Sequence, residues 1–242
     1  LHGEGHSFPT RRSSDLPLAF CVAGGAGVVV ERTVIRRLHG RPLETLLATW
    51  GVSLVLQQLV RTVFGASNRP VEAVAWMAGA FPLGQLTITY NRLWILLFAL
   101  AVVAAVATVL ARTPLGLQIR AVTQNRAMAE EMGIDSERVD MATFGLGSAI
   151  AGIAGVALSQ IENVSPNLGQ AYIIDCFMVI VFGGVGNLLG TLSGAMTLGV
   201  TSKFVEPELG AVAAKVAILA FIIVFMQFRP RGLFPQRGRA AE

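Results

Sequence analysis

The chain has 242 residues, of which 53% are hydrophobic and only 14% charged, and its mean hydropathy is +0.62. This composition excludes an ordinary water-soluble domain and indicates a membrane-embedded protein. Cys21 and Cys176 both lie in apolar runs, which excludes a disulfide framework and a zinc cluster. The net charge of +4 comes from basic residues in short loops between apolar runs, so we expect no nucleic-acid partner and no metal site.

Residues 1–16 read LHGEGHSFPTRRSSDL and lack both the apolar core and the cleavage site of a secretory signal. They are typical of a non-native leader or cloning scar. Arg11 and Arg12 allow a twin-arginine interpretation, which the absence of a following signal core disfavours. The next apolar run, residues 17–30, has only 14 residues. We interpret it as the remnant of a membrane span, so that the natural chain begins further upstream.

Long stretches without charge predict membrane-spanning helices. Between Arg92 and Arg112, Asp140 and Glu162, and Asp175 and Lys203 there are 19, 21 and 27 uncharged residues. About 20 apolar residues span a bilayer as a helix. Hydropathy predicts seven spans, the first one partial, at residues 17–30, 43–64, 93–111, 141–161, 171–186, 188–202 and 209–228. The fold class is therefore an all-α, polytopic transmembrane helix bundle over residues 17–228, followed by a basic tail at 229–242.

The stretch between Asp175 and Lys203 allows either one long tilted helix or two short spans. Glycine weakens helices, so Gly183, Gly184 and Gly186 predict a break near the middle. We therefore favour two spans joined near the cytoplasmic face.

Loop charges predict the orientation. Residues 32–41, residues 112–138 and the tail each carry four arginines, and seven spans place all three on one side. The 61–92 connection carries three arginines and residues 162–170 none. The positive-inside rule makes the arginine-rich side cytoplasmic, and with it the C-terminus.

Polar residues recur at every fourth position of the predicted helix 43–64. They are Thr45, Thr49, Ser53, Gln57 and Arg61, which share one helical face. This ridge has two interpretations, hydrogen bonds between helices or the lining of a polar substrate's path. Together with the neighbouring Gln58, we predict Thr49, Ser53 and Gln57 as substrate-pathway residues.

Small residues recur at four-residue spacing in two other helices. One stripe is Gly147, Ala151 and Gly155, and the second is Gly186, Gly190 and Gly194. Such spacing lets helix backbones approach closely in lipid, either within one chain or against a partner subunit. We predict packing or flexing at the glycines of the second region, namely Gly183, Gly184, Gly186, Gly190 and Gly194.

Catalytic and nucleotide-binding motifs are missing from the sequence. It contains no Gly-Lys-Ser/Thr phosphate loop, so we expect this chain not to bind ATP through such a loop and to hold no cofactor. The predicted spans contain no series of carboxylates and histidines that could relay protons, which disfavours a proton-coupled carrier. They also contain no cluster of polar residues at similar depth in several spans, which disfavours a membrane enzyme.

The longest predicted soluble connection is residues 112–138. Within it, residues 121–132 predict one amphipathic helix that exposes Gln124, Arg126, Glu130 and Glu131. On the cytoplasmic face such a helix is either a docking surface for a soluble partner or a solvated connector.

This connection resembles the cytoplasmic coupling segment of ATP-binding-cassette permeases of the branched-chain amino acid and urea uptake group. The resemblance rests on Arg120-Ala121-Val122, Asn125, Ala129 and Met132-Gly133-Ile134. Further similar motifs follow the same order along the chain, at residues 41–43, 48–54, 163–169, 182–187, 190–191 and 229–234. Within the group the details are most similar to the urea permease subunit. The front departs from the family, because its first spans are missing.

The resemblance implies a non-enzymatic transport subunit of the bacterial inner membrane. It would pair with a second permease subunit and with cytoplasmic ATP-binding subunits, and a periplasmic binding protein would supply the substrate. The residues implied in ATPase coupling are Arg120, Asn125, Ala129, Glu130, Met132, Gly133 and Ile134. Urea is the expected substrate; the alternatives are a branched-chain amino acid permease of the same group and an ATP-independent channel for small amides.

Overall fold

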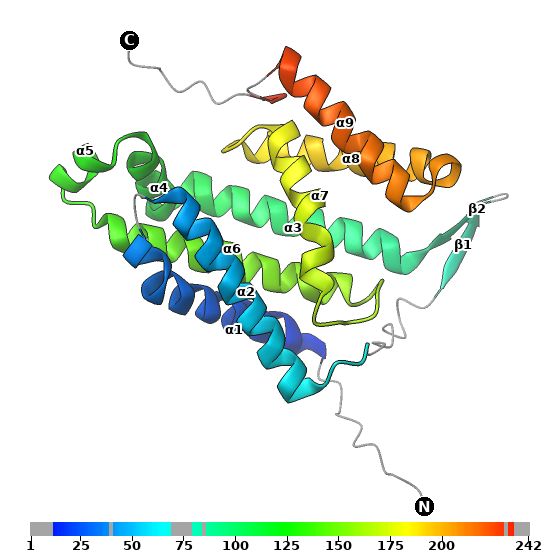
Figure 1. The fold of residues 1–242 in the computed structure, drawn as a ribbon, viewed down its shortest axis with the longest axis horizontal. Coiled ribbons are helices and arrows are strands. Elements are labelled where there is room, and N and C mark those ends of the chain that lie inside the picture. The colour runs from blue at the N-terminus through cyan, green and yellow to red at the C-terminus, as the bar shows by residue number, and fades with distance from the viewer. Residues whose placement is uncertain (1–11, 39–40, 69–78, 84–85, 230–231, 235–242) are drawn as a thin grey trace, which may run out of the picture. The chain divides into compact units, whose positions relative to one another are not determined.

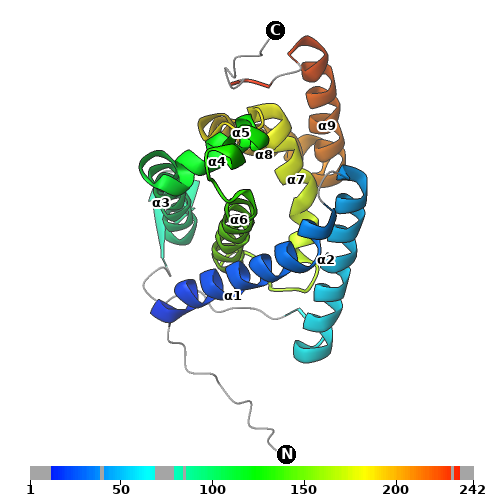
Figure 2. The same cartoon turned by 90° about the vertical axis from the view of Figure 1, so that its left-hand side faces the viewer.

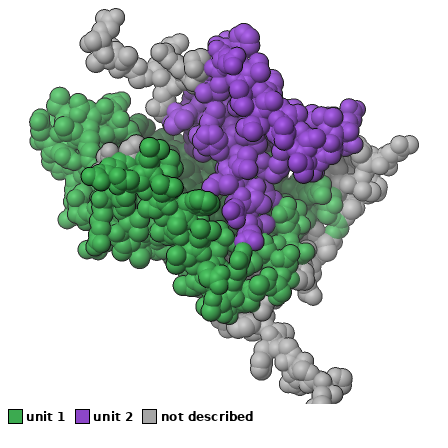
Figure 3. All heavy atoms as spheres, in the orientation of Figure 1, with its two compact units in different colours: residues 1–166 green, residues 167–242 purple. Residues whose placement is uncertain are grey.

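The computed structural model describes residues 12–38, 41–68, 79–83, 86–229 and 232–234 (Figure 1). The chain divides into two compact units, residues 1–166 and 167–242, which Figure 3 shows in separate colours. Of the predicted leader, residues 12–16 belong to the first helix and the rest lies outside the described residues. Of the basic tail, only Arg229 and residues 232–234 are described.

In its described residues the first unit consists of helices and one short β-hairpin. In chain order its elements are α1 (Arg12–Thr33), the 3-10 helix η1 (Ile35–Leu38), α2 (Pro42–Phe64), β1 (Ala80–Leu83), β2 (Leu86–Thr89), α3 (Tyr90–Arg112), α4 (Pro114–Gln124), α5 (Arg126–Glu131) and α6 (Ser136–Leu158). The hairpin is antiparallel, with Ala80 opposite Thr89 and Leu83 opposite Leu86. The sequence did not predict it, but the helical class is unaffected.

The most extensive helix contact in the first unit joins α1 to α6. A Cβ built at Gly24 lies 3.1 Å from the Cβ of Ala149, and one at Gly152 would collide with Ala23. Because the numbering rises along α1 while it falls along α6, the two helices are antiparallel. The small side chains let the backbones approach where lipid supplies no hydrophobic drive.

The packed face of α6 differs from the predicted stripe. Among the described residues, a Cβ at Gly147 or Gly155 meets nothing within 4 Å, and Ala151 is exposed. Gly145, Ala149 and Gly152 form the contact instead. The 147–155 stripe therefore makes no close helix contact among the described residues, and packing against a partner subunit stays a prediction.

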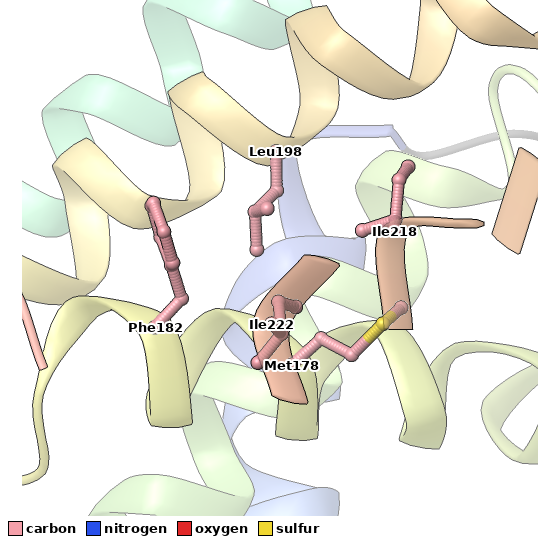
Figure 4. Close-up of a cluster of buried hydrophobic side chains, with 5 residues drawn as sticks. All are labelled: Met178, Phe182, Leu198, Ile218 and Ile222. Atoms are coloured by element: carbon pink, nitrogen blue, oxygen red, sulfur yellow. The ribbon is translucent and has the colours of Figure 1, made fainter. Parts of the chain in front are cut away.

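The second unit is a three-helix arrangement of α7 (Leu168–Gly183), α8 (Leu188–Leu209) and α9 (Ala211–Phe228). The predicted helix break is confirmed, because residues 184–187 separate α7 from α8. Five buried side chains converge between the three helices, as Figure 4 shows: Met178, Phe182, Leu198, Ile218 and Ile222.

All seven predicted spans correspond to helices. Five segments are long and apolar enough to cross a bilayer: Leu16–Leu38, Leu43–Phe64, Tyr90–Arg112, Ser136–Leu158 and Ala211–Phe228. The first is 23 residues long, so it exceeds the 14-residue remnant predicted from hydropathy. α7 is a shorter apolar helix, and α8 carries Lys203, Glu206 and Glu208 in its last two turns. The polytopic helical class is confirmed.

Candidate functional site

The coupling segment (residues 112–138) lies at one end of α3 and α6, and the β-hairpin lies at the other end of α3 (Figure 1). Figure 2 views α3 and α6 from the end that carries α4 and α5. At the start of the segment, Thr113 is extended, with φ −100° and ψ 153°, and Pro114 opens α4. A Cβ at the buried Gly116 would collide with the backbone of Leu110, so only glycine allows α4 to fold back this closely on α3.

Asn125 divides the predicted amphipathic helix into two. Its extended backbone, with φ −155° and ψ 102°, ends α4, while its side-chain oxygen accepts a hydrogen bond from the Met128 N–H at 3.1 Å and so caps α5. The prediction of a single helix over residues 121–132 is therefore wrong. Asparagine favours such a position because its side chain replaces a missing backbone partner.

Gly133 ends α5 in a Schellman turn. Its φ is +84°, a left-handed conformation that glycine adopts without steric cost. The Gly133 N–H donates to the Glu130 carbonyl at 2.9 Å, and the Ile134 N–H donates to the Ala129 carbonyl at 3.0 Å. Asp135 then caps α6 by accepting from the Arg138 N–H at 3.2 Å. The chain thus reverses in four residues with its helix ends satisfied.

A small apolar core holds α4, α5 and α6 together. Val122, Ala129 and Val139 are 9%, 4% and 6% exposed, and Ile119, Ala121 and Ile134 pack around them. α5 has only six residues and is too short to be stable alone, so this packing fixes its position.

Charged contacts reinforce the core. The Arg126 guanidinium donates to Asp140 at 2.8 Å and to Glu130 at 3.2 Å, which joins α5 to α6. Partial burial alone would lower the pKa of Arg126, but the hydrogen bonds and negative charges of Asp140 and Glu130 outweigh it and raise the pKa. An ion pair between Arg36 and Glu137 connects η1 to α6. Arg126 is therefore half-buried and paired, whereas the sequence predicted it as exposed.

The predicted coupling residues fall into two groups. Arg120, Asn125, Glu130, Met132 and Gly133 are exposed. Ala129 is buried and Ile134 is half-buried, so these two support the segment from within. Sequence reasoning missed the side chains of Leu117 and Met128, which are 65% and 58% exposed, beside Met132 at 78%. The spacing of Met128 and Met132, one helical turn apart and flanking two glutamates, was the available signal.

The predicted substrate-pathway residues lie on α2. Thr49, Ser53 and Gln57 are half-exposed, as are Thr45 and Arg61, while Gln58 is exposed and lies off this face. The Thr49 hydroxyl donates to the Leu46 carbonyl at 3.0 Å within its own helix. The polar ridge of α2 therefore lies on the less exposed side of the helix, and Gln58 lies outside the ridge.

The predicted glycines surround the turn between α7 and α8. A Cβ at Gly183 or Gly190 would collide with the backbone of the other, and one at Gly194 would lie 3.1 Å from the Val179 carbonyl oxygen. Gly184 and Gly186 have φ of +99° and +84° and form the turn itself. Asn187 caps α8 by accepting from the N–H groups of Leu189 and Gly190 at 3.1 and 3.3 Å.

The C-terminal residues 232–234 close this turn. The Leu233 N–H donates to the Phe182 carbonyl at 3.0 Å and the Phe234 N–H to the Gly183 carbonyl at 3.3 Å, so the last carbonyls of α7 gain partners. The Asn187 side-chain amide donates to the Phe234 carbonyl at 3.3 Å. No sequence feature predicted this contact apart from the motif at residues 229–234.

The long apolar helices define a polytopic membrane protein, in which the coupling segment forms a structured connection between α3 and α6. The chain belongs to the family described as the permease component of branched-chain amino acid transport systems, which matches residues 14–227. Members of this family are transport subunits of ATP-binding-cassette importers and leave ATP hydrolysis to a separate subunit. The chain is therefore a multi-pass protein of the inner membrane and not an enzyme.

Individual relatives agree with the family. The branched-chain amino acid permease protein BraD of Pseudomonas aeruginosa is 26% identical over 234 residues, covering 94% of this chain and 76% of the relative. LivH of Escherichia coli K12, named for the same transport, is 28% identical over 223 residues, covering 89% and 71%. The fructose import permease FrcC of Rhizobium meliloti is 28% identical over 207 residues, covering 77% and 55%. No solved structure matches this chain significantly.

Proposed function

We propose that this chain is a permease subunit of an ATP-driven importer of branched-chain amino acids. The names of BraD and LivH support this substrate over urea. Urea, which the sequence resemblance favoured, has no comparable support among these relatives. The full assembly would contain a second permease subunit, two cytoplasmic ATPases and a periplasmic binding protein, with the C-terminus of this chain in the cytoplasm.

The observation that carries the proposal is the exposed surface of the coupling segment. Leu117, Met128 and Met132 present apolar side chains to solvent, and Glu130 and Glu131 add negative charge beside them. Methionine adapts its shape to a partner, which suits a contact that must persist through a conformational change. The surface fits a groove that is apolar at its centre and basic at its rim.

The support beneath this surface suits force transmission. Caps at Asn125 and Asp135, the turn at Gly133 and the Arg126–Asp140 pair fix α5 to α6. A push on α5 would thus move α6 as a body, because packed cores shift between discrete arrangements and do not deform continuously. The ridge on α2, with Thr49, Ser53 and Gln57, is a proposed part of the substrate path.

The test is uptake of labelled leucine and labelled urea in cells that lack both systems. The chain is co-expressed with its partner permease, binding protein and ATPase, alongside an ATPase-dead control. We expect leucine uptake that requires the active ATPase. Urea uptake that leucine does not inhibit would restore the urea assignment, and flux indifferent to the dead ATPase would identify a channel.

Variants of the coupling segment test the docking surface. Gly133→Pro, or the charge reversals Glu130→Lys and Glu131→Lys, are expected to abolish uptake while the protein stays in the membrane. Glu208→Lys, an exposed reversal at the end of α8, is the matched control and is expected to be silent. Unchanged ATPase association in the coupling variants would remove this part of the proposal.

A further inference from the structure

An ion pair joins α7 to α9 inside the second unit. The Lys215 Nζ lies 3.0 Å from the Asp175 Oδ2, and the two residues are 40 positions apart in the sequence. The side chains are 50% and 34% exposed, respectively. The pair is therefore accessible from outside the unit.

The pair is the first of several layers between two parallel helices. One turn further along each helix, Met178 and Ile218 are buried, and beyond them the rings of Phe182 and Phe225 lie 4.8 Å apart. In the orientation that the loop charges predict, α7 and α9 both begin at the outer face. The charged layer thus faces outwards, and an aromatic layer closes the cytoplasmic side.

The position of the ion pair within the membrane-spanning part of α7 is energetically costly, and such charges usually have a function. Asp175 is the eighth of 16 residues in α7, so it lies about 10 Å along the helix axis from Leu168. Charges at membrane depth are expensive and generally face protein or a water-filled path. A half-exposed pair at this depth indicates contact with water or a polar ligand on its open side.

We propose that Asp175 and Lys215 form a binding site for the zwitterionic backbone of the transported amino acid. The inference rests on the proposed function and adds the residues that recognise its substrate. The substrate ammonium pairs with the Asp175 carboxylate, and the substrate carboxylate pairs with the Lys215 ammonium. Two opposite protein charges side by side match an α-amino acid, whose two charged groups are attached to one carbon.

The charge balance favours this exchange. The empty pair is neutral, the zwitterion is neutral, and so the loaded site carries no net charge into the membrane. Each protein charge is already partly withdrawn from water in the empty state, with 50% and 34% of the two side chains exposed, so binding removes less water from them than from free ions. Urea has no charged groups and would gain little from opening the pair.

The surroundings also suit an aliphatic side chain. Val212, Val216 and Leu219 lie within one turn of Lys215 on α9 and are 80%, 62% and 40% exposed. On α7, the neighbouring Ile174 is 56% exposed. These side chains give the substrate's branched end an apolar contact beside the charged site.

The test exchanges the two charged residues and measures leucine uptake separately from ATP hydrolysis. The assembled complex, reconstituted in proteoliposomes, carries Asp175→Lys with Lys215→Asp, which keeps an ion pair between α7 and α9. Leucine uptake and ATP hydrolysis are measured at saturating leucine-loaded binding protein. The control exchanges Lys203 and Glu206, an exposed pair at 2.6 Å within α8.

We expect the exchanged pair to keep ATP hydrolysis at the wild-type level and to lower the maximum leucine uptake rate about tenfold, since reversed charges mispair with the substrate. The control keeps both rates. Wild-type uptake per ATP in the exchanged variant would overturn the inference, and so would a parallel loss of hydrolysis and uptake, which a purely structural pair predicts. Failure of the wild-type complex to import leucine would instead overturn the proposed function.

Discussion

The coupling segment and the turn between α7 and α8 each connect helices through only a few residues, but different contacts hold those helices together. In the coupling segment Asn125 caps the start of α5 and the left-handed Gly133 ends it, whereas between α7 and α8 the left-handed Gly184 and Gly186 precede the capping Asn187. In the coupling segment, apolar side chains hold the helices together. Where α7 and α8 cross, the backbones of Gly183 and Gly190 are in direct contact, because neither residue has a side chain.

The difference follows from the side chains available at each place. Water rewards the burial of apolar side chains, so a loop on the aqueous side gains stability from a small core. Gly183 and Gly190 have no side chains to bury, so close backbone approach and hydrogen bonds supply the attraction at their crossing. An added side chain should therefore destabilise the crossing of α7 and α8 more than the exposed turn at Gly133.

The largest effect is expected for Gly190→Leu. The new side chain would meet the Gly183 backbone, which cannot move aside, so the free energy of unfolding should fall by about 3 kcal/mol. Thermal unfolding of the detergent-purified protein measures the change. Gly199→Leu, on the same helix with nothing within 4 Å of its Cβ among the described residues, is the control. Equal loss in both variants would show that the crossing is not special.

Gly133→Val should have a smaller effect of another kind. A Cβ at Gly133 meets nothing within 4 Å among the described residues, so only its φ of +84° opposes the substitution, at a cost of about 1–2 kcal/mol. We expect faster proteolysis of the coupling segment and weaker ATPase capture, with the helices of the second unit unaffected. Gly147→Val is the control in a helix with open space. An unaltered proteolysis rate would contradict the role of the turn.

The two capping asparagines allow a direct comparison. Asn125→Ala removes one accepted hydrogen bond and should cost about 1 kcal/mol, because water can replace the lost partner. Asn187→Ala leaves two N–H groups and the Phe234 carbonyl without their partner, so a cost of about 2 kcal/mol is expected. Unfolding of the two variants in the same detergent checks the order. The reverse order would mean that water reaches the turn between α7 and α8 as easily as it reaches the coupling segment.

The smallest effect is expected for the Arg126–Asp140 pair. The side chains are 38% and 28% exposed, so a double-mutant cycle with Arg126→Gln and Asp140→Asn should give a coupling of about 0.5 kcal/mol. Raising the salt concentration should reduce it further. A salt-independent coupling above that size would show that the pair is more buried in the assembled transporter.

The sequence located the helices and the turns well. Arg92 and Arg112 bracket the predicted third span, and the observed α3 begins at Tyr90 and ends at Arg112. The break in the glycine cluster was also predictable, because only Gly184 and Gly186 adopt left-handed backbone there without strain. In the coupling segment, by contrast, helical periodicity concealed the division at Asn125, since α4 and α5 keep their apolar residues on one shared core.

By itself the sequence determined where the long apolar helices lie and where the glycine turns fall, because the cost of a charge in lipid and the conformational freedom of glycine are local properties. Only the tertiary structure decided which face of α6 packs on α1, since small residues occur on more than one of its faces. It also decided that Asp175 meets Lys215 and that residues 232–234 close the α7–α8 turn. Contacts between residues far apart in the chain depend on how helices pack, and no periodicity along a single helix specifies its partner.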